Sequence, residues 1–266
     1  MEILGYIASI FMGLSLGMIG GGGSILTVPI LVYLFGIAPI LATAYSLFIV
    51  GSTALFGGLV SLRQGAVDLK TGITFAIPSF IGVYSTRAYL VPRLPDPVFH
   101  GESFTISKPL LIMIVFAILM VVASLSMIRS GPPSPSNRVL SPSVRIALIA
   151  IEGLLVGGIT GFVGAGGGFL IIPALVVLVG LPMKKAVGTS LFIIAAKSLI
   201  GFLGDVQQPA VIDWQLLFIV TGIALGGLFL GMRISKNISE GILKKGFGYF
   251  VLVIGSLMLI DQIRRL

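Results

Sequence analysis

Long apolar stretches recur along the chain and are separated by short segments that hold most of the charged residues. Most of these stretches are close to or above the ~20 residues needed to span the hydrocarbon core of a bilayer. They cover residues 3–36, 40–62, 71–91 and 109–128, and then residues 144–180, 185–204, 215–232 and 246–260. The pattern predicts an all-α integral membrane protein that crosses the bilayer several times.

The first stretch of each group is too long for a single crossing. A helix of some 34 residues would measure about 50 Å, whereas the hydrocarbon core is about 30 Å thick. Glycine clusters at Gly20–Gly23 and Gly164–Gly168 lie inside these stretches, where they weaken a helix. We therefore expect two helical hairpins broken at the glycines, with short second arms over about 24–36 and 169–180. Each half then contains about five membrane elements.

The glycine clusters belong to a motif that occurs twice, 144 residues apart. Gly17-Met-Ile-Gly-Gly-Gly-Gly-Ser-Ile-Leu-Thr-Val-Pro29 returns as Gly161-Phe-Val-Gly-Ala-Gly-Gly-Gly-Phe-Leu-Ile-Ile-Pro173. Residues 17–59 and 161–203 share 18 identities in 43 positions without a gap, more than shared apolar composition explains. The expected organisation is a first membrane repeat over 1–129, a polar linker over 130–143 and a second membrane repeat over 144–266.

Equivalent loops of the two repeats carry opposite charge. The loop after the hairpin is uncharged in the first repeat but carries Lys184 and Lys185 in the second. The next loop is basic in the first repeat, with Arg63 and Lys70, and acidic in the second, with Asp205 and Asp213. Under the positive-inside rule this reversal predicts two inverted repeats, with both termini outside.

Composition supports the membrane assignment and excludes several kinds of site. The chain is 56% hydrophobic and 10% charged, with a mean hydropathy of +1.14, whereas soluble domains carry about 25% charged residues. There is no cysteine, and the one histidine, His100, has no second histidine with which to build a usual zinc site. We expect no metal or other cofactor. The net charge of +8 is spread over loops, which fits membrane topology better than binding to nucleic acid.

The glycine clusters are the first candidates for a binding site. A helix that begins just after a glycine turn presents free backbone N–H groups and the positive end of its dipole, and both bind anions. The alternative is close helix packing, although a run of four or five small residues exceeds what packing requires. The candidate substrate-binding residues are Gly20, Gly21, Gly22, Gly23 and Ser24 in the first turn, Gly164, Ala165, Gly166, Gly167 and Gly168 in the second, and Ser46, Thr189 and Ser190 as further hydroxyl donors.

Lys197 is the sharpest single candidate. It lies about two turns from either end of the apolar stretch Ala186–Gly204, where a lysine costs roughly 2.5–3.5 kcal/mol on insertion scales. Its spacing from Ser190 and Gly201 places all three residues on one helical face. Lys197 is therefore either a counter-charge for an anionic substrate or a side chain that extends toward the membrane interface.

Glu152 is an acidic residue inside an apolar helix, over residues 146–164. Carboxylates at such depth often relay protons, which makes Glu152 a candidate for proton coupling. The alternative is an ion pair with Lys197 or a nearby arginine.

Three other charged residues have structural explanations. Asp68 and Asp213 precede helices at equivalent positions and are expected to be N-caps rather than ligands. Arg87 ends its helix near an outer loop, where we expect it to anchor the helix at the interface. An anion-attracting vestibule is the alternative role for Arg87.

The doubled motif resembles that of the sulfite exporter TauE/SafE family of bacterial membrane transporters. The matching features are Gly17-x-x-Gly-Gly-Gly-Gly-x5-Pro29, Gly161-x-x-Gly-Ala-Gly-Gly-Gly-x4-Pro173, Gly188-Thr-Ser-Leu-Phe-Ile193, and the segments Val67-Asp68 and Ile212-Asp213-Trp214. The resemblance covers nearly the whole chain. It implies transport of small sulfur-containing anions, such as sulfite, sulfoacetate or related organosulfonates, across the bacterial cytoplasmic (inner) membrane.

These observations predict a secondary transporter for a small anion, coupled to protons and working by alternating access of two halves. The alternative is a passive anion channel with the same glycine site. A membrane enzyme is disfavoured because the chain lacks cysteine, a metal cluster and a clear nucleophile–base pair. A non-transporting scaffold would not need paired glycine breaks. The expected partners are a small anionic substrate and the lipid bilayer, and a homodimer is left open.

Overall fold

The computed structural model describes residues 2–100, 105–129, 142–177, 179–206, 212–235 and 239–264. Within these ranges six helices are long and apolar enough to cross a membrane. They are α3 (Pro39–Arg63), α6 (Lys108–Arg129), α7 (Pro142–Val163), α9 (Met183–Val206), α10 (Trp214–Ile234) and α11 (Glu240–Ile263). Shorter apolar helices accompany them, so the predicted all-helical multi-pass membrane fold is confirmed at this level.

The shorter elements fill the places where the sequence predicts broken helices. The first half opens with α1 (Glu2–Ile19), followed by the 3-10 turn η1 (Gly21–Leu26), α2 (Thr27–Pro29) and the π-helical turn η2 (Ile30–Leu34). The second opens with α7 and continues into α8 (Gly168–Val177). Between α3 and α6 lie α4 (Leu69–Ser85), the π-helical turn η3 (Thr86–Leu90), α5 (Val91–Arg93) and a hairpin of β1 (Phe99–His100) and β2 (Thr105–Ile106), which the sequence analysis did not predict.

The helix breaks fall at the glycine clusters. Gly20 and Gly164, which follow the last residues of α1 and α7, have φ angles of 75° and 70°, in the left-handed region that favours glycine. After the first break the chain folds back on α1, so that the ring of Tyr6 packs edge-on against Phe35 with 5.2 Å between centroids. In the second half, α8 packs on η1 and α9.

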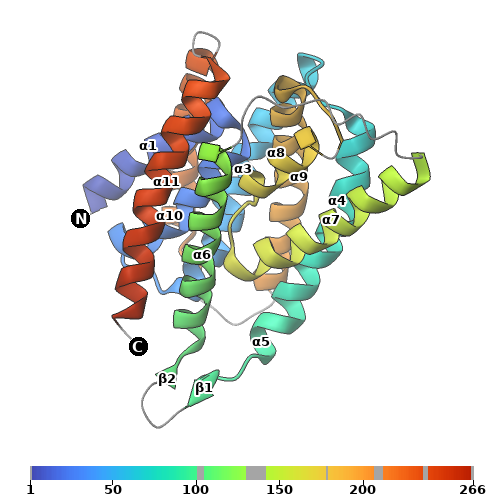
Figure 1. Ribbon diagram of the computed structural model, residues 1–266. Coiled ribbons are helices and arrows are strands. Elements are labelled where there is room, and N and C mark those ends of the chain that lie inside the picture. Colours follow the sequence, from blue (N-terminus) through green and yellow to red (C-terminus); the bar gives the residue numbers. More distant parts are fainter. Residues whose placement is uncertain are drawn as a thin grey trace.

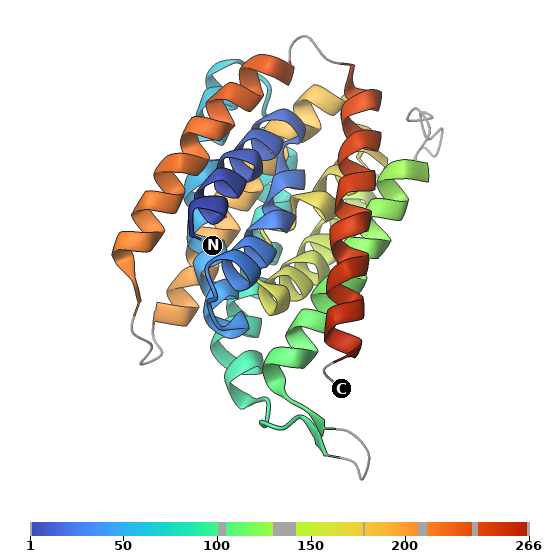
Figure 2. The ribbon, with the colours of Figure 1, turned by 90° about the vertical axis from the view of Figure 1, so that its left-hand side faces the viewer.

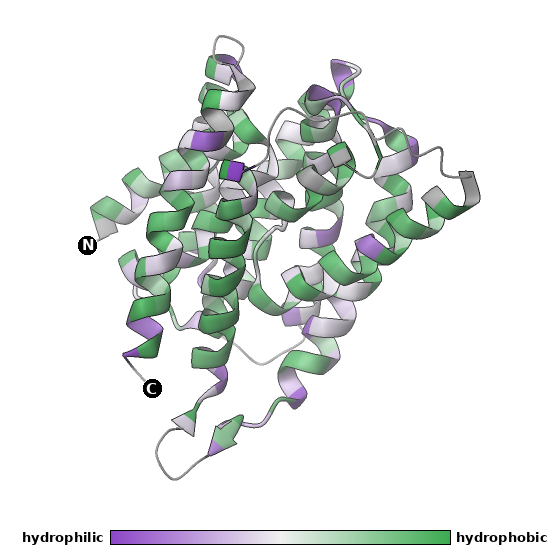
Figure 3. Cartoon of the chain, viewed as in Figure 1, coloured by the Kyte–Doolittle hydropathy of each residue, from purple (hydrophilic) through white to green (hydrophobic). Residues whose placement is uncertain are grey.

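The helices pack in four long pairs, which Figures 1 and 2 show from two sides. α1 lies beside α10, α4 beside α7, α3 beside α9, and α6 beside α11. The pair α3 and α9 is central, because 67% of the apolar stretch of each is buried, against 33–44% in the other four long helices. The outer helices are hydrophobic over most of their length (Figure 3) and expose large apolar side chains such as Phe218 and Leu257. That exposure suits contact with lipid.

Candidate functional site

The two glycine turns meet in the interior of the protein. A methyl group on Gly21 would overlap Cα of Gly168, and one on Gly168 would overlap Cα of Gly21. Both residues are buried. The small residues therefore let two backbones approach more closely than any larger side chain allows, which brings the breaks of the two halves together.

In the second turn, several backbone N–H groups have no acceptor among the residues that the structure describes. The N–H of Gly164 donates to the carbonyl oxygen of Thr160 across 2.9 Å, which completes the last turn of α7. The N–H groups of Ala165, Gly166 and Gly167 have no acceptor in the described part of the chain, although all three residues are buried. Buried N–H groups without acceptors are rare in folded proteins. An anion is a suitable acceptor for such a cluster.

Lys197 brings a cation to this turn. Its side chain is 1% exposed, and Nζ donates to Oγ1 of Thr160 across 2.6 Å. A Cβ atom on Gly167 would lie 2.7 Å from Nζ, so the ammonium group is against the backbone of the turn. Of the two alternatives for Lys197, extension toward the membrane interface is therefore wrong, because the side chain is buried inside the protein. Its described hydrogen-bond partner is a neutral hydroxyl, and no carboxylate of the described residues lies within 4.0 Å of Nζ.

The hydroxyl candidates divide into one unpartnered group and three that bond to the backbone. Ser24 Oγ donates to the carbonyl of Gly21 across 2.6 Å, and Ser190 Oγ donates to the carbonyl of Val187 across 2.8 Å. Thr189 Oγ1 accepts from the N–H of Asp68, at 2.9 Å. Ser46 Oγ is buried and has no partner among the described residues.

Both glycine turns pack against α9. Ser190 lies near the first turn, because a Cβ on Gly20 would be 3.1 Å from its Oγ. Lys197 lies against the second turn, two helical turns further along the same helix. Ile194, between them, contacts Gly21, Gly166 and Gly168 through its side chain. Ile194 therefore packs against the glycines of both turns at their junction.

Glu152 lies apart from this cluster. It is half-buried on α7, and no ion pair joins it to any residue that the structure describes. The expected alternative of an ion pair with Lys197 or an arginine is wrong within the described ranges.

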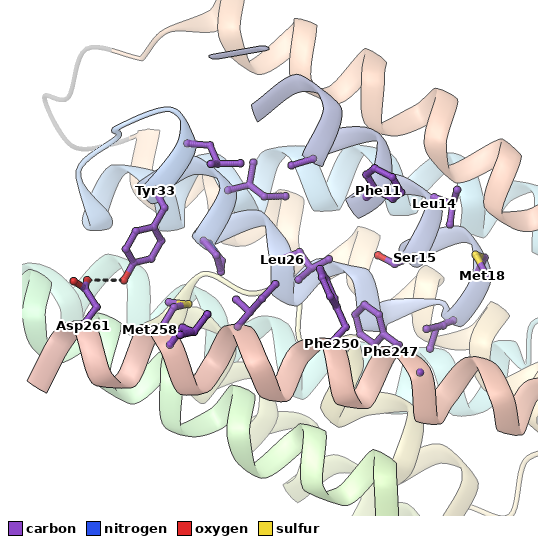
Figure 4. A pocket seen from close by; sticks show the side chains of 18 of the residues that line it. Phe11, Leu14, Ser15, Met18, Leu26, Tyr33, Phe247, Phe250, Met258 and Asp261 are labelled. Atoms are coloured by element: carbon purple, nitrogen blue, oxygen red, sulfur yellow. Dashed lines mark hydrogen bonds between the residues drawn. The ribbon is translucent and has the colours of Figure 1, made fainter. Parts of the chain in front are cut away.

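A separate cavity of about 960 Å³ lies between the first hairpin and α11 (Figure 4). Its lining is almost entirely apolar, with Phe11, Leu26, Phe247 and Phe250 among the side chains, and none of the predicted site residues lines it. At one end Tyr33 donates to Asp261 across 3.0 Å. An apolar cavity offers an anion no donors, so the glycine junction remains the candidate site.

The predicted caps are confirmed. Asp68 accepts a hydrogen bond from the N–H of Thr71, and Asp213 accepts one from the N–H of Leu216, each across 2.9 Å. The two carboxylates therefore satisfy free N–H groups in the first turns of α4 and α10.

Arg87 corrects the sequence analysis. Its side chain is fully buried rather than exposed at an interface. Nη1 lies 3.4 Å from Oδ1 of Asp205, which is in the last turn of α9. Sequence alone places Asp205 in a loop and does not identify Thr160 as a site residue. The signals were present: Thr160 lies four residues before the second break, and Asp205 lies eight residues after Lys197.

Comparison with known proteins adds a family to this geometry. The sequence model of the family described as "Sulfite exporter TauE/SafE" matches residues 6–258. A protein of Xylella fastidiosa (strain 9a5c), described as a probable membrane transporter protein, is 30% identical over 249 residues, which cover 91% of this chain and 88% of that protein. The probable membrane transporter protein YunE of Bacillus subtilis (strain 168) is 26% identical over 290 residues, covering 98% and 99% of the two chains. No solved structure matches the chain.

Proposed function

The chain belongs to the sulfite exporter TauE/SafE family of membrane transporters, and from this we propose that it moves a small sulfur-containing anion across the bacterial cytoplasmic membrane. Sulfite, sulfoacetate and related organosulfonates are the proposed substrates. Family membership makes the chain a transporter and not an enzyme. Family membership alone does not identify the substrate or the energy source.

One observation carries the proposal: the ammonium group of Lys197 lies against a turn in which three backbone N–H groups have no acceptor among the described residues. An isolated ammonium ion in a low-dielectric interior is strongly disfavoured, and its described partner is only the hydroxyl of Thr160. A small oxyanion at this point would supply the missing negative charge. It would also accept hydrogen bonds from the N–H groups of Ala165, Gly166 and Gly167. The site thus selects for charge and for several acceptor oxygens on a small ligand.

We propose further that the two halves are repeats related by a two-fold axis. The packing of α1 on α10 is the counterpart of the packing of α7 on α4. Single contacts agree. A Cβ on Gly57 would meet Leu191, and a Cβ on Gly201 would meet Leu47, and each residue of one contact lies 144 positions from its counterpart in the other. The opposite charges of equivalent loops support an inverted relation.

Alternating access follows from this arrangement. Ile194 packs against glycines of both turns and Val50 packs against Gly166 of the second, which supports a junction that is closed in this conformation. Rocking of one repeat against the other would open the junction to one side of the membrane at a time. Glu152 is the proposed proton site, since it lies inside an apolar helix and pairs with no described cation. A passive channel with the same site is the second candidate and needs no coupling acid.

Flux into proteoliposomes tests the proposal. Purified protein is reconstituted, and uptake of sulfite, sulfoacetate, sulfate and a carboxylate is measured with and without an imposed pH gradient. We expect sulfite or an organosulfonate to accumulate against its own gradient in the wild type, with little flux in Lys197→Ala. Lys245→Ala removes an exposed lysine of α11 and is the matched control. Equal flux in Lys197→Ala and the wild type would remove the assigned role of the lysine.

A second variant separates transporter from channel. Glu152→Gln keeps the shape of the side chain and removes its proton exchange. We expect downhill flux to persist in this variant and accumulation driven by the pH gradient to stop. Wild-type protein that equilibrates an anion without ever concentrating it would favour the passive channel instead.

A further inference from the structure

A buried ion pair joins η3, the turn that follows α4, to the end of α9. Nη1 of Arg87 lies 3.4 Å from Oδ1 of Asp205, with the two side chains 0% and 11% exposed. Nε and Nη2 of Arg87 and Oδ2 of Asp205 have no hydrogen-bond partner among the described residues. The carboxylate therefore uses one donor of a guanidinium group that has five. A buried pair is favourable only when its geometry is good and its other polar atoms are bonded, and this pair meets neither condition.

The local backbone gives neither residue a structural purpose. Arg87 lies in the π-helical turn η3, and such turns are uncommon and frequently found at functional sites. Asp205 lies in the last turn of α9, where the negative end of the helix dipole disfavours a carboxylate. Two apolar side chains would hold the helices together at least as well.

The Arg87–Asp205 pair and Lys197 are connected by the contact between α4 and α9. On α9, Lys197 and Asp205 are eight residues apart, which places them about 12 Å apart along the helix and about 80° apart around it. Gly201 and Gly204, between them, pack against Val83 and Arg87 of the opposite helix. A Cβ on Gly204 would lie 3.2 Å from Cβ of Arg87. The contact between α4 and α9 thus runs from the glycine junction to the end that leads to α5 and the β1–β2 hairpin (Figure 1).

We propose that Arg87 is a second anion-binding residue on the transport path, at which the substrate oxyanion displaces Asp205. The proposal rests on the proposed function and extends it. Nε–H and Nη2–H form a planar fork that matches two oxygens of a sulfite or sulfonate group. When the anion leaves for Lys197, Asp205 returns to Arg87 and closes the path. The carboxylate thereby acts as a tethered competitor for the site.

The decisive variant replaces both partners with apolar side chains. Arg87→Met with Asp205→Leu removes the pair without leaving a buried charge, and we expect its unfolding temperature in detergent to match or exceed that of the wild type. Its KM for sulfite in proteoliposomes should rise about tenfold or more, as expected for the loss of hydrogen bonds to a charged group. Arg93→Gln removes an exposed arginine near the same end and should leave KM unchanged. A wild-type KM in the double variant would show a structural pair only and overturn the proposal.

Asp205→Asn provides the second test and decides the matter if the double variant does not fold. It removes the competing charge and leaves the guanidinium, so KM for sulfite should fall several-fold while release slows. An unchanged or higher KM would overturn the proposal. If Lys197→Ala abolishes flux while both pair variants keep the wild-type KM, the proposed function stands and only the role of Arg87 fails. Wild-type protein that carries none of the anions would fail the function itself.

Discussion

The backbone N–H of Asp213 donates to the hydroxyl of Tyr45 across 2.6 Å and so fixes the start of α10 to α3. Its counterpart is the bond from the N–H of Asp68 to Thr189 Oγ1, which fixes the start of α4 to α9. Tyr45 and Thr189 are 144 residues apart, and the two aspartates are 145 apart. Two different side chains therefore perform the same task at equivalent places in the two halves.

This pairing predicts matched losses of stability. Tyr45→Phe and Thr189→Val each leave one N–H without its acceptor, so each should lower the free energy of unfolding by about 0.5–1.5 kcal/mol. Thermal unfolding in detergent measures the loss. Asp68 and Asp213 keep their capping bonds in both variants, which serves as the internal control. A rise in KM for sulfite in Thr189→Val but not in Tyr45→Phe would add a binding role to Thr189.

The contact between the glycine turns predicts a severe effect of one methyl group. Gly21→Ala and Gly168→Ala each place a Cβ on top of the opposing backbone, which cannot move aside as a side chain can. We expect each to lower stability by about 3 kcal/mol or more and to abolish flux. Gly222→Ala in α10 is the control, because its Cβ would meet nothing within 4 Å. The control should be neutral or gain up to about 1 kcal/mol from its higher helix propensity.

The hydrogen bond between Thr160 and Lys197 predicts ligand-dependent stability. Thr160→Val keeps the shape of the side chain and leaves the ammonium group without its described partner, which should cost about 1.5–3 kcal/mol. Saturating sulfite should recover more stability in this variant than it adds to the wild type, because the anion becomes the partner of Lys197. The measurement is the shift in unfolding temperature with sulfite, and Thr160→Ser should behave as the wild type does. Equal shifts in Thr160→Val and the wild type would place the anion elsewhere.

Most of the helices could be predicted because, in a membrane protein, each long apolar stretch of sequence corresponds to a helix. The predicted stretches 40–62 and 109–128 match α3 and α6 within one or two residues. The breaks fall at Gly20 and Gly164, where the backbone needs positive φ angles. Helix capping by Asp68 and Asp213 follows from local chemistry, which a sequence records well.

The site could be predicted only in part because it depends on contacts between distant segments. Periodicity placed Lys197 on a helical face but gave no partner for it, and Thr160 lies 37 residues away. Arg87 was expected at the interface because it lies at a helix end. Its partner Asp205 is 118 residues away, and no local pattern predicts that contact. The packing of Ile194 against the glycines also depends on tertiary structure and could not be predicted from the sequence.

The closed junction predicts when a buried position becomes reactive. The chain contains no cysteine, so a single introduced thiol reports without background. Ser46 is the position of choice, since it lies one helical turn after Thr43, which packs against Gly164 of the second turn. Its side chain is fully buried, lacks a described partner for Oγ, and differs from cysteine by one atom. Ser46→Cys should resist a small membrane-impermeant thiol reagent in the closed state. Thr105→Cys, on the exposed strand β2, should react at all times and is the control.

Alternating access and a passive channel differ in how Ser46→Cys reacts during transport. If the two halves rock, substrate should raise the labelling rate, and at any instant the thiol should be open to one side only. Conditions that trap the protein open to one side, such as a steep anion gradient, should then protect the thiol from reagent on the other side. A channel opens to both sides together, so reagent from either side would label the thiol equally under every gradient. Equal labelling of that kind, with Thr105→Cys reacting normally, would replace the transporter with the channel.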